Sequence, residues 1–198
     1  LLVPLLSAVE EDWLALACFS RLVSRLRPPQ SAAESFAITD ESATCAQPGA
    51  SCAQPGAIPD PRVSALRLLL QSLDPQLHGH LQRCGGRGCH GCSAKPFERF
   101  QRWFLYDFKF EFPHDDIMLV WETVWAASEL LGSSDSFSAF VAMAMLQEYR
   151  RQILDRDLDF DQIMQFYDEM GGRHNTQRIL RWARELVASV IRLCKARV

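Results

Sequence analysis

The stretch FERFQRWFLYDFKFEFPHDDIMLVWETVWAA, residues 97–127, decides the fold because it places many large aromatic side chains at helical spacing. Residues three and four positions apart share one side of an α-helix, so the first half of the stretch predicts a helix with one apolar face. That face comprises Phe97, Phe100, Trp103, Phe104 and Phe108.

The second half of the stretch predicts another helix, separated from the first at Phe112 and Pro113. Proline cannot continue a helix, and it also restricts the residue before it. Asp115 and Asp116 are expected in the first turn of the second helix, where carboxylates interact favourably with the helix dipole. The predicted apolar face of this helix comprises Ile117, Val120, Trp121, Val124 and Trp125.

Five further helices are predicted from the same spacing on either side of the central stretch. They cover residues 5–26, 62–81, 136–154, 159–170 and 174–194. Their expected apolar faces are Leu6, Val9, Trp13, Leu16, Ala17, Ser20 and Val23 in the first; Leu66, Leu69, Leu70, Leu73, Leu77 and Leu81 in the second; Phe137, Phe140, Val141, Ala144, Met145 and Tyr149 in the third; Phe160, Ile163, Met164 and Tyr167 in the fourth; and Leu180, Ala183, Val187, Val190, Ile191 and Cys194 in the fifth. The chain is therefore expected to be all-α, with about seven helices.

The composition narrows the class of protein. The chain has 198 residues, which is long enough for a buried core, and its net charge of −3 does not favour a nucleic-acid binder. No apolar run in the sequence reaches the roughly 18 residues that a membrane-spanning helix requires. The seven cysteines are odd in number, which favours a reduced, intracellular protein over a disulfide scaffold.

Two segments are predicted to be insertions without secondary structure. Residues 28–61 hold six of the ten prolines and a tandem repeat, CAQPGAS followed by CAQPGA, and we expect a disordered linker. Residues 82–96, QRCGGRGCHGCSAKP, are expected to form a Gly/Cys-rich loop. Together with nearby histidines, the cysteines of this loop are the ligand types of a zinc site: Cys84, Cys89, Cys92, His78, His80 and His90. Only Cys89 and Cys92 have a common ligand spacing, so we favour free thiols and expect no metal.

The string RWFLYDFKFEFPHDDIMLVWETVW, residues 102–125, resembles the signature of the TBC domain, the helical domain that activates Rab GTPases. The resemblance is to the small G protein signalling modulator branch of that family. The matching blocks are Arg102-Trp103-Phe104-Leu105, Asp107-Phe108-Lys109, Asp115-Asp116 and Trp121-Glu122-x-x-Trp125, at the family's spacing. One departure is Phe110, where the family usually has a second basic residue after the lysine. The structural signature taken from this match is Trp103, Phe108, Trp121, Glu122 and Trp125.

The resemblance implies that residues 1–198, apart from the two insertions, are the C-terminal part of a TBC-type domain. It further implies a GTPase activator whose partner is a GTP-bound Rab, located in the cytoplasm and peripherally at endomembranes. TBC proteins supply a catalytic Arg from an Ile-x-x-Asp-x-x-Arg motif and a Gln from Tyr-x-Gln, and neither motif occurs in this sequence. The chain is therefore expected to have no catalytic residue and no cofactor, and to be inactive alone.

Two questions stay open at this point. Arg102 and Lys109 are polar positions in an apolar segment, and they either form salt bridges with Glu98, Asp107 or Glu111 or face the GTPase and support its site. The chain itself is either part of a GTPase activator or an α-helical interaction module without such activity. A regulatory domain linked by zinc or thiols through residues 84–92 is a third hypothesis.

Overall fold

The computed structural model describes residues 2–9, 11–26, 60–85, 96–130 and 136–195. Within these ranges the secondary structure is helical and no strand occurs, so the predicted all-α class is confirmed. The chain divides into two compact units, Leu1–Gly56 and Ala57–Val198, and we describe each separately. The α-helices are α1 (Leu2–Ala8), α2 (Asp12–Leu26), α3 (Pro61–Leu73), α4 (Pro75–Gly85), α5 (Gln101–Leu105), α6 (Ile117–Leu130), α7 (Ser136–Glu148), α8 (Arg150–Asp155), α9 (Phe160–Met170) and α10 (Thr176–Lys195).

The first unit contains α1 and α2, where the sequence predicted one continuous helix. The predicted apolar face is also wrong, because Trp13 and Leu16 are 67% and 59% exposed, whereas Ala15 and Leu22 are buried. Apolar residues occupy nearly every position from 14 to 19, so their periodicity does not single out one side of this helix.

In the second unit, the predicted helix over residues 62–81 is two helices, α3 and α4, with the break at Asp74 and Pro75. Asp74 forms capping hydrogen bonds with both helices. Its backbone N–H donates to the carbonyl of Leu70 at the end of α3, and its side chain accepts from the N–H of Leu77 at 3.0 Å in α4. The same carboxylate accepts a hydrogen bond from Nε of Arg150 at 2.6 Å, so one buried side chain joins α3, α4 and α8.

Replacing Asp74 with alanine is expected to lower the free energy of unfolding by about 2 kcal/mol, because a helix cap and a charge-assisted hydrogen bond are lost together. Asp74→Asn keeps an oxygen for the cap and loses the charge, so it should cost roughly half as much. Urea denaturation followed by circular dichroism measures both changes. Equal losses for the two variants would mean that the cap contributes nothing.

Helix α7 packs against α3 and α10 in the interior of the second unit. Four residues of its predicted apolar face are buried, but the other sides of the helix are buried as well. The buried residues are Phe137, Ser138, Ala139, Val141, Ala142, Met143, Ala144, Met145 and Leu146. A helix that is apolar all round is the expected form for a central position. The helix also ends at Glu148, and α8 follows Tyr149 as a separate short helix.

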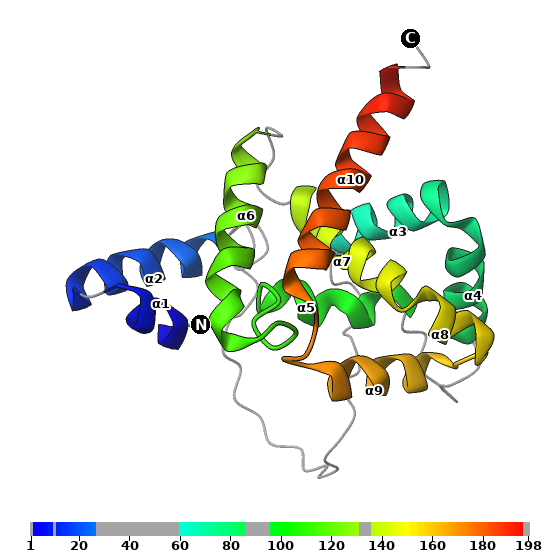
Figure 1. The fold of residues 1–198 in the computed structure, drawn as a ribbon, viewed down its shortest axis with the longest axis horizontal. Helices are drawn as coiled ribbons and strands as arrows, with labels where there is room; N and C mark the ends of the chain where they lie inside the picture. Colours follow the sequence, from blue (N-terminus) through cyan, green and yellow to red (C-terminus); the bar gives the residue numbers. More distant parts are fainter. Residues whose placement is uncertain (1, 10, 27–59, 86–95, 131–135, 196–198) are drawn as a thin grey trace, which may run out of the picture. The chain divides into compact units, whose positions relative to one another are not determined.

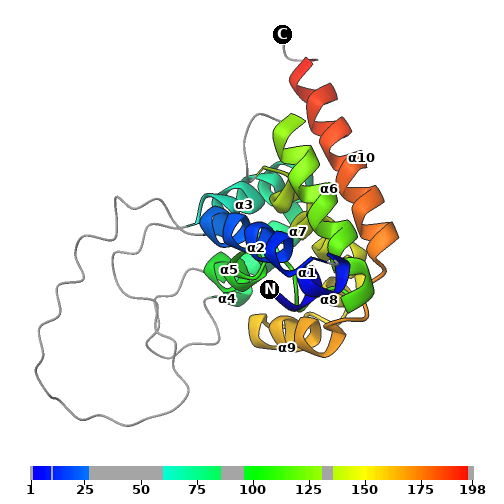
Figure 2. The same cartoon turned by 90° about the vertical axis from the view of Figure 1, so that its left-hand side faces the viewer.

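Helices α9 and α10 complete the second unit. Helix α9, Phe160–Met170, agrees with the predicted range 159–170; Asp159 and Gln162 form a capping box at its start, and Gly171 is its C-cap. Its predicted apolar face, Phe160, Ile163, Met164 and Tyr167, is buried. Figures 1 and 2 both show α9 at one end of this unit and the C-terminal end of α10 at the other. Only the first half of the apolar face predicted for α10 is covered, since Leu180 and Ala183 are buried but Ile191 is 44% exposed.

Most of the two predicted insertions lies outside the described residues, including residues 28–59 and the possible ligands Cys89, His90 and Cys92. Their boundaries need correction, because Asp60 and Pro61 begin α3 and residues 82–85 belong to α4. Cys84 is buried in α4 with its Sγ 3.4 Å from Nε2 of His80, and both groups face the carbonyl of Leu158. Among the described residues, no group of three or more possible ligands could hold a metal ion, and no helix is long and apolar enough to cross a membrane.

Candidate functional site

The first helix predicted in the central stretch is shorter than its aromatic spacing suggests. A 3₁₀ helix, Pro96–Phe100, leads into α5, which ends at Leu105 instead of continuing to Phe112. A second 3₁₀ helix, His114–Asp116, contains the acidic pair and leads into α6. The five residues predicted to face inward from the first helix are nevertheless all buried, and Phe108 reaches the core from the turn that follows α5.

We call residues 105–110 the aromatic turn. Asp107 and Phe108 have φ angles of 48° and 62°, a left-handed conformation that costs side-chain-bearing residues roughly 1–2 kcal/mol each. The indole Nε1 of Trp121 donates to the carbonyl of Asp107 at 2.8 Å, and Nε1 of Trp125 donates to its carboxylate at 3.4 Å. These two tryptophans of α6 therefore hold the turn in its strained conformation.

The conformation of the turn determines which of its aromatic side chains are buried and which are exposed. Phe108 is 1% exposed, whereas Tyr106 and Phe110 are 47% and 58% exposed and pack edge to face. Leu105 is 48% exposed beside them. The turn thus presents a small apolar surface on a backbone that is fixed by α6.

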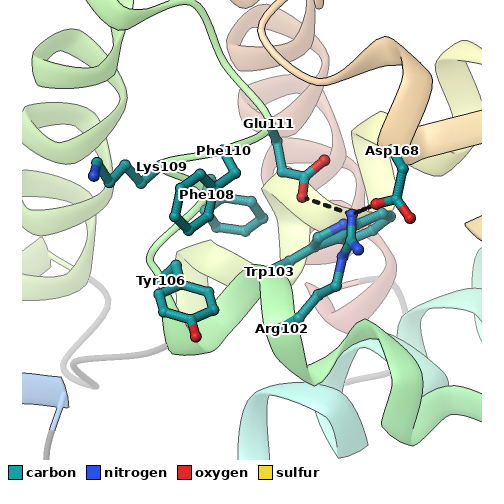
Figure 3. A pocket seen from close by; sticks show the side chains of 8 residues that line it. All are labelled: Arg102, Trp103, Tyr106, Phe108, Lys109, Phe110, Glu111 and Asp168. Atoms are coloured by element: carbon teal, nitrogen blue, oxygen red, sulfur yellow. Dashed lines mark hydrogen bonds and ion pairs between the residues drawn. The ribbon is translucent and has the colours of Figure 1, made fainter. Parts of the chain in front are cut away.

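A pocket of about 270 Å³ lies beside the aromatic turn. Its lining residues are Arg102, Trp103, Tyr106, Phe108, Lys109, Phe110, Glu111 and Asp168. Figure 3 shows Tyr106, Phe108 and Phe110 on one side of the pocket and the guanidinium of Arg102, with Glu111 and Asp168, on the other. The pocket therefore has one aromatic side and one charged side.

Arg102 is the centre of the charged side. Its Nη2 lies 3.4 Å from Oε1 of Glu111, one of the salt bridges considered from the sequence, and it also pairs with Asp168 of α9. The partnership with Asp168 was not predicted, because nothing in the sequence places α9 beside α5. Lys109 lines the same pocket, but its ammonium group points away from the pocket and lies 5.1 Å from the centre of the Phe110 ring.

Behind Arg102 lies a buried group of titratable side chains. Glu111 is 3% exposed, and burial raises the pKa of its carboxyl from 4.5 to about 7, although the nearby Arg102 acts in the opposite direction. Oε2 of Glu111 is 4.0 Å from Nε2 of His174, and Nδ1 of His174 is 2.9 Å from the hydroxyl of Tyr149. Burial lowers the pKa of His174 from 6.5 to about 4, so this imidazole is neutral at pH 7. Sequence reasoning did not identify this cluster, because its members Glu111, Tyr149 and His174 come from three separate segments.

The remaining signature residues have mixed exposure. Trp103 and Trp121 are fully buried, whereas Trp125 is half-buried and stacks on Trp121 with 5.8 Å between the ring centres. Glu122 is exposed on α6 and lines a second, shallower pocket of about 490 Å³ together with Arg184 of α10. Nothing in the geometry of Glu122 connects it to the aromatic turn.

Comparison with known proteins finds relatives over nearly the whole chain. Small G protein signaling modulator 1 from Homo sapiens is 35% identical over 190 residues, which are 96% of this chain and 14% of that protein. Small G protein signaling modulator 2 from Mus musculus is 36% identical over 96% of this chain and 16% of that protein. Rab GTPase-activating protein tbc-8 from Caenorhabditis elegans is 31% identical over 93% of this chain and 17% of that protein.

The chain therefore spans less than one fifth of the length of these relatives. No family model matches the chain, and no solved structure matches it. The relationship predicted from residues 102–125 is confirmed: the chain is a homologue, over nearly its whole length, of small G protein signaling modulators and of Rab GTPase-activating TBC proteins.

Proposed function

We propose that residues 1–198 form the C-terminal part of a TBC domain that activates a Rab GTPase. In this proposal the chain contributes core packing and a surface that binds the GTP-bound Rab, and it needs no cofactor. Its place of action is the cytoplasm, at the surface of endomembranes. The names of the relatives support the class of partner, since one of them is described as a Rab GTPase-activating protein.

The aromatic turn is the observation that carries the proposal. Interfaces between proteins derive much of their affinity from a few aromatic and arginine side chains that are already held in place. Tyr106 and Phe110 are exposed aromatic residues on a turn that Trp121 fixes, so little conformational freedom is lost when they bind a partner. Lys109 lies within the turn and provides positive charge beside this surface, whereas Arg102 lies across the pocket, where it pairs with Glu111 and Asp168.

The proposed role excludes catalysis by this chain alone. An arginine finger neutralises the charge that develops on the transferred phosphoryl group, and a water-orienting Gln positions the nucleophile. The sequence has no Ile-x-x-Asp-x-x-Arg and no Tyr-x-Gln motif. Arg102 is already paired with two carboxylates, which also makes it a poor finger. We therefore assign it and Lys109 to partner contact and support of the site.

The expected result is selective binding of the purified chain to at least one Rab in a panel loaded with a GTP analogue, measured by calorimetry against the GDP-loaded form. Tyr106→Ser combined with Phe110→Ser should weaken this binding about tenfold or more, because two aromatic anchors are lost. Leu68→Ser is the matched control, since Leu68 is also a large apolar residue and is 62% exposed on α3. Circular dichroism checks that all variants are folded.

A single-turnover assay of phosphate release completes the test. The chain alone should leave the rate of GTP hydrolysis by every Rab unchanged. Acceleration that Arg102→Ala abolishes would contradict the assignment and place an arginine finger in this chain. Binding that ignores the nucleotide, or that survives loss of the two aromatic residues, would favour the interaction module without GTPase activation.

A further inference from the structure

We infer that the C-terminal end of α10 is a docking site for an anionic membrane surface. This inference concerns a different face of the chain from the aromatic turn, and it does not depend on the proposed Rab partner. It rests on three properties of the last turns of α10: they are exposed, they carry basic residues, and they have apolar side chains on opposite sides of the helix.

The last turns of α10 are less buried than its first turns. The buried residues of this helix are Thr176, Ile179, Leu180 and Ala183, so none follows Ala183 among its described residues. Figures 1 and 2 both show the helix projecting beyond the other helices of its unit at the C-terminal end. Residues 191–195 are all exposed and are therefore available to a surface outside the chain.

The charge of α10 differs in sign from that of the whole chain. The helix carries five basic residues and one acidic residue, Glu185, whereas the chain has a net charge of −3. Its basic residues are Arg178, Arg181, Arg184, Arg192 and Lys195. Two of these residues, Arg192 and Lys195, lie in the exposed last turns, and basic residues near a membrane surface are attracted to anionic lipid headgroups. A second copy of this chain fits poorly, because two such helices would repel each other.

The apolar residues at the tip favour lipid over a partner helix. Ile191 and Leu193 are 44% and 50% exposed, and residues two positions apart point to nearly opposite sides of a helix. A groove of a partner protein covers one side of a helix, but the headgroup and acyl region of a bilayer surrounds an inserted tip. Arg192 and Lys195 lie on the same turns, and their long side chains can reach lipid phosphates while their stems stay apolar.

The test is co-sedimentation of the purified chain with vesicles of phosphatidylcholine, with or without about 30 mol% phosphatidylserine, at low and high salt. The expected result is binding to the anionic vesicles only, weakened by salt. Arg192→Glu with Lys195→Glu should reduce the binding at least about tenfold, and Ile191→Ser with Leu193→Ser should reduce it as well. The matched control is Arg151→Glu with Leu68→Ser, an exposed basic and an exposed apolar residue outside α10, which should bind like the unaltered chain.

Three outcomes would overturn the inference. The first is no binding to anionic vesicles by the unaltered chain. The second is equal loss of binding in the control and the α10 variants, which would indicate a general charge effect. The third is a concentration-dependent dimer in sedimentation velocity that the Ile191→Ser, Leu193→Ser variant abolishes, which would assign the tip to a second copy. None of these outcomes bears on Rab binding by the aromatic turn.

Discussion

Replacing Trp121 with alanine is expected to lower the free energy of unfolding by about 3–5 kcal/mol, the usual cost of deleting a large buried aromatic side chain. Trp121 is completely buried in α6 and stacks on Trp125. Its indole also donates the hydrogen bond that holds the carbonyl of Asp107. The substitution therefore leaves a cavity in the core and a buried carbonyl without its partner.

Trp121→Phe separates these two effects. The phenyl ring retains much of the apolar volume, but the donor to Asp107 is lost, which costs about 1–3 kcal/mol when the acceptor stays buried. The aromatic turn should then become more mobile, because its left-handed residues lose a restraint. Hydrogen exchange at the amides of residues 106–110 should therefore be faster in this variant, while exchange in α9 is unchanged.

The control for both variants is Trp13→Ala, because Trp13 is 67% exposed and surface substitutions usually change stability by less than about 0.5 kcal/mol. Urea denaturation followed by circular dichroism gives all three values. A loss for Trp121→Ala no larger than that for Trp13→Ala would contradict the buried position of Trp121. An unchanged exchange rate in Trp121→Phe would show that the turn is held by other contacts.

The sequence predicts the second helix of the central stretch better than the first, for a physical reason. The helical period predicts the face of α6 as Ile117, Val120, Trp121, Val124 and Trp125; the first four are buried, and Trp125 is half-buried. The aromatic run after Leu105 follows the same period, with no glycine or proline before Pro113 to signal an end. The helix ends there because Trp121, 14 residues later, stabilises a left-handed turn. Local periodicity contains no information about that contact.

The break at Asp74 and Pro75 is a different kind of error. Here the local signal was present, since a proline preceded by a capping residue commonly begins a new helix. The leucine stripe continues across the break, because α3 and α4 both present leucines to the core: Leu66, Leu70, Leu77 and Leu81. Apolar periodicity therefore predicts one continuous helix, but in the structure the proline determines the boundary.

The pocket could be predicted only in part. Arg102 and Glu111 are close in sequence, so their salt bridge was among the alternatives considered, and it is present. Asp168 and His174 reach the same place through α9 and the segment before α10, which the helical pattern does not position. Sequence reasoning thus identified the residues of one segment, and the tertiary packing added the rest.

The stability of the chain is expected to change little between about pH 4.5 and 6.5 as far as Glu111 and His174 are concerned, because their pKa shifts oppose each other. The pKa of Glu111 rises from 4.5 to about 7 on folding, so the folded chain binds this proton more tightly than the unfolded chain. This group therefore lowers the free energy of unfolding as pH increases from 4.5 to 7. The pKa of His174 falls from 6.5 to about 4, so this group raises the free energy of unfolding as pH increases from 4 to 6.5.

Single substitutions should reveal how much each of these two groups contributes to the pH dependence of the free energy of unfolding. Relative to the unaltered chain, Glu111→Gln should gain about 3 kcal/mol of stability between pH 4.5 and 7, because it never ionises inside the core. His174→Asn, which keeps a hydrogen-bonding atom for Tyr149, should show the opposite change and be relatively most stable near pH 4. Subtracting the free energy of unfolding of the unaltered chain at each pH removes the contributions of the titratable groups that the substitution leaves unchanged, among them Arg102, Asp168 and Tyr149.

The measurement is the free energy of unfolding from urea titrations at half-unit steps between pH 4 and 8. A Glu111→Gln curve parallel to that of the unaltered chain would mean that Glu111 ionises in the folded chain as it does in water. Curves parallel to that of the unaltered chain for both Glu111→Gln and His174→Asn would have a different explanation. Glu111 and His174, whose Oε2 and Nε2 atoms are 4.0 Å apart, would then hold one proton between them as an ion pair. Removing either side chain would abolish the pKa shift of the other. Glu111→Gln combined with His174→Asn decides between these cases, because independent groups give additive slopes and a shared proton does not.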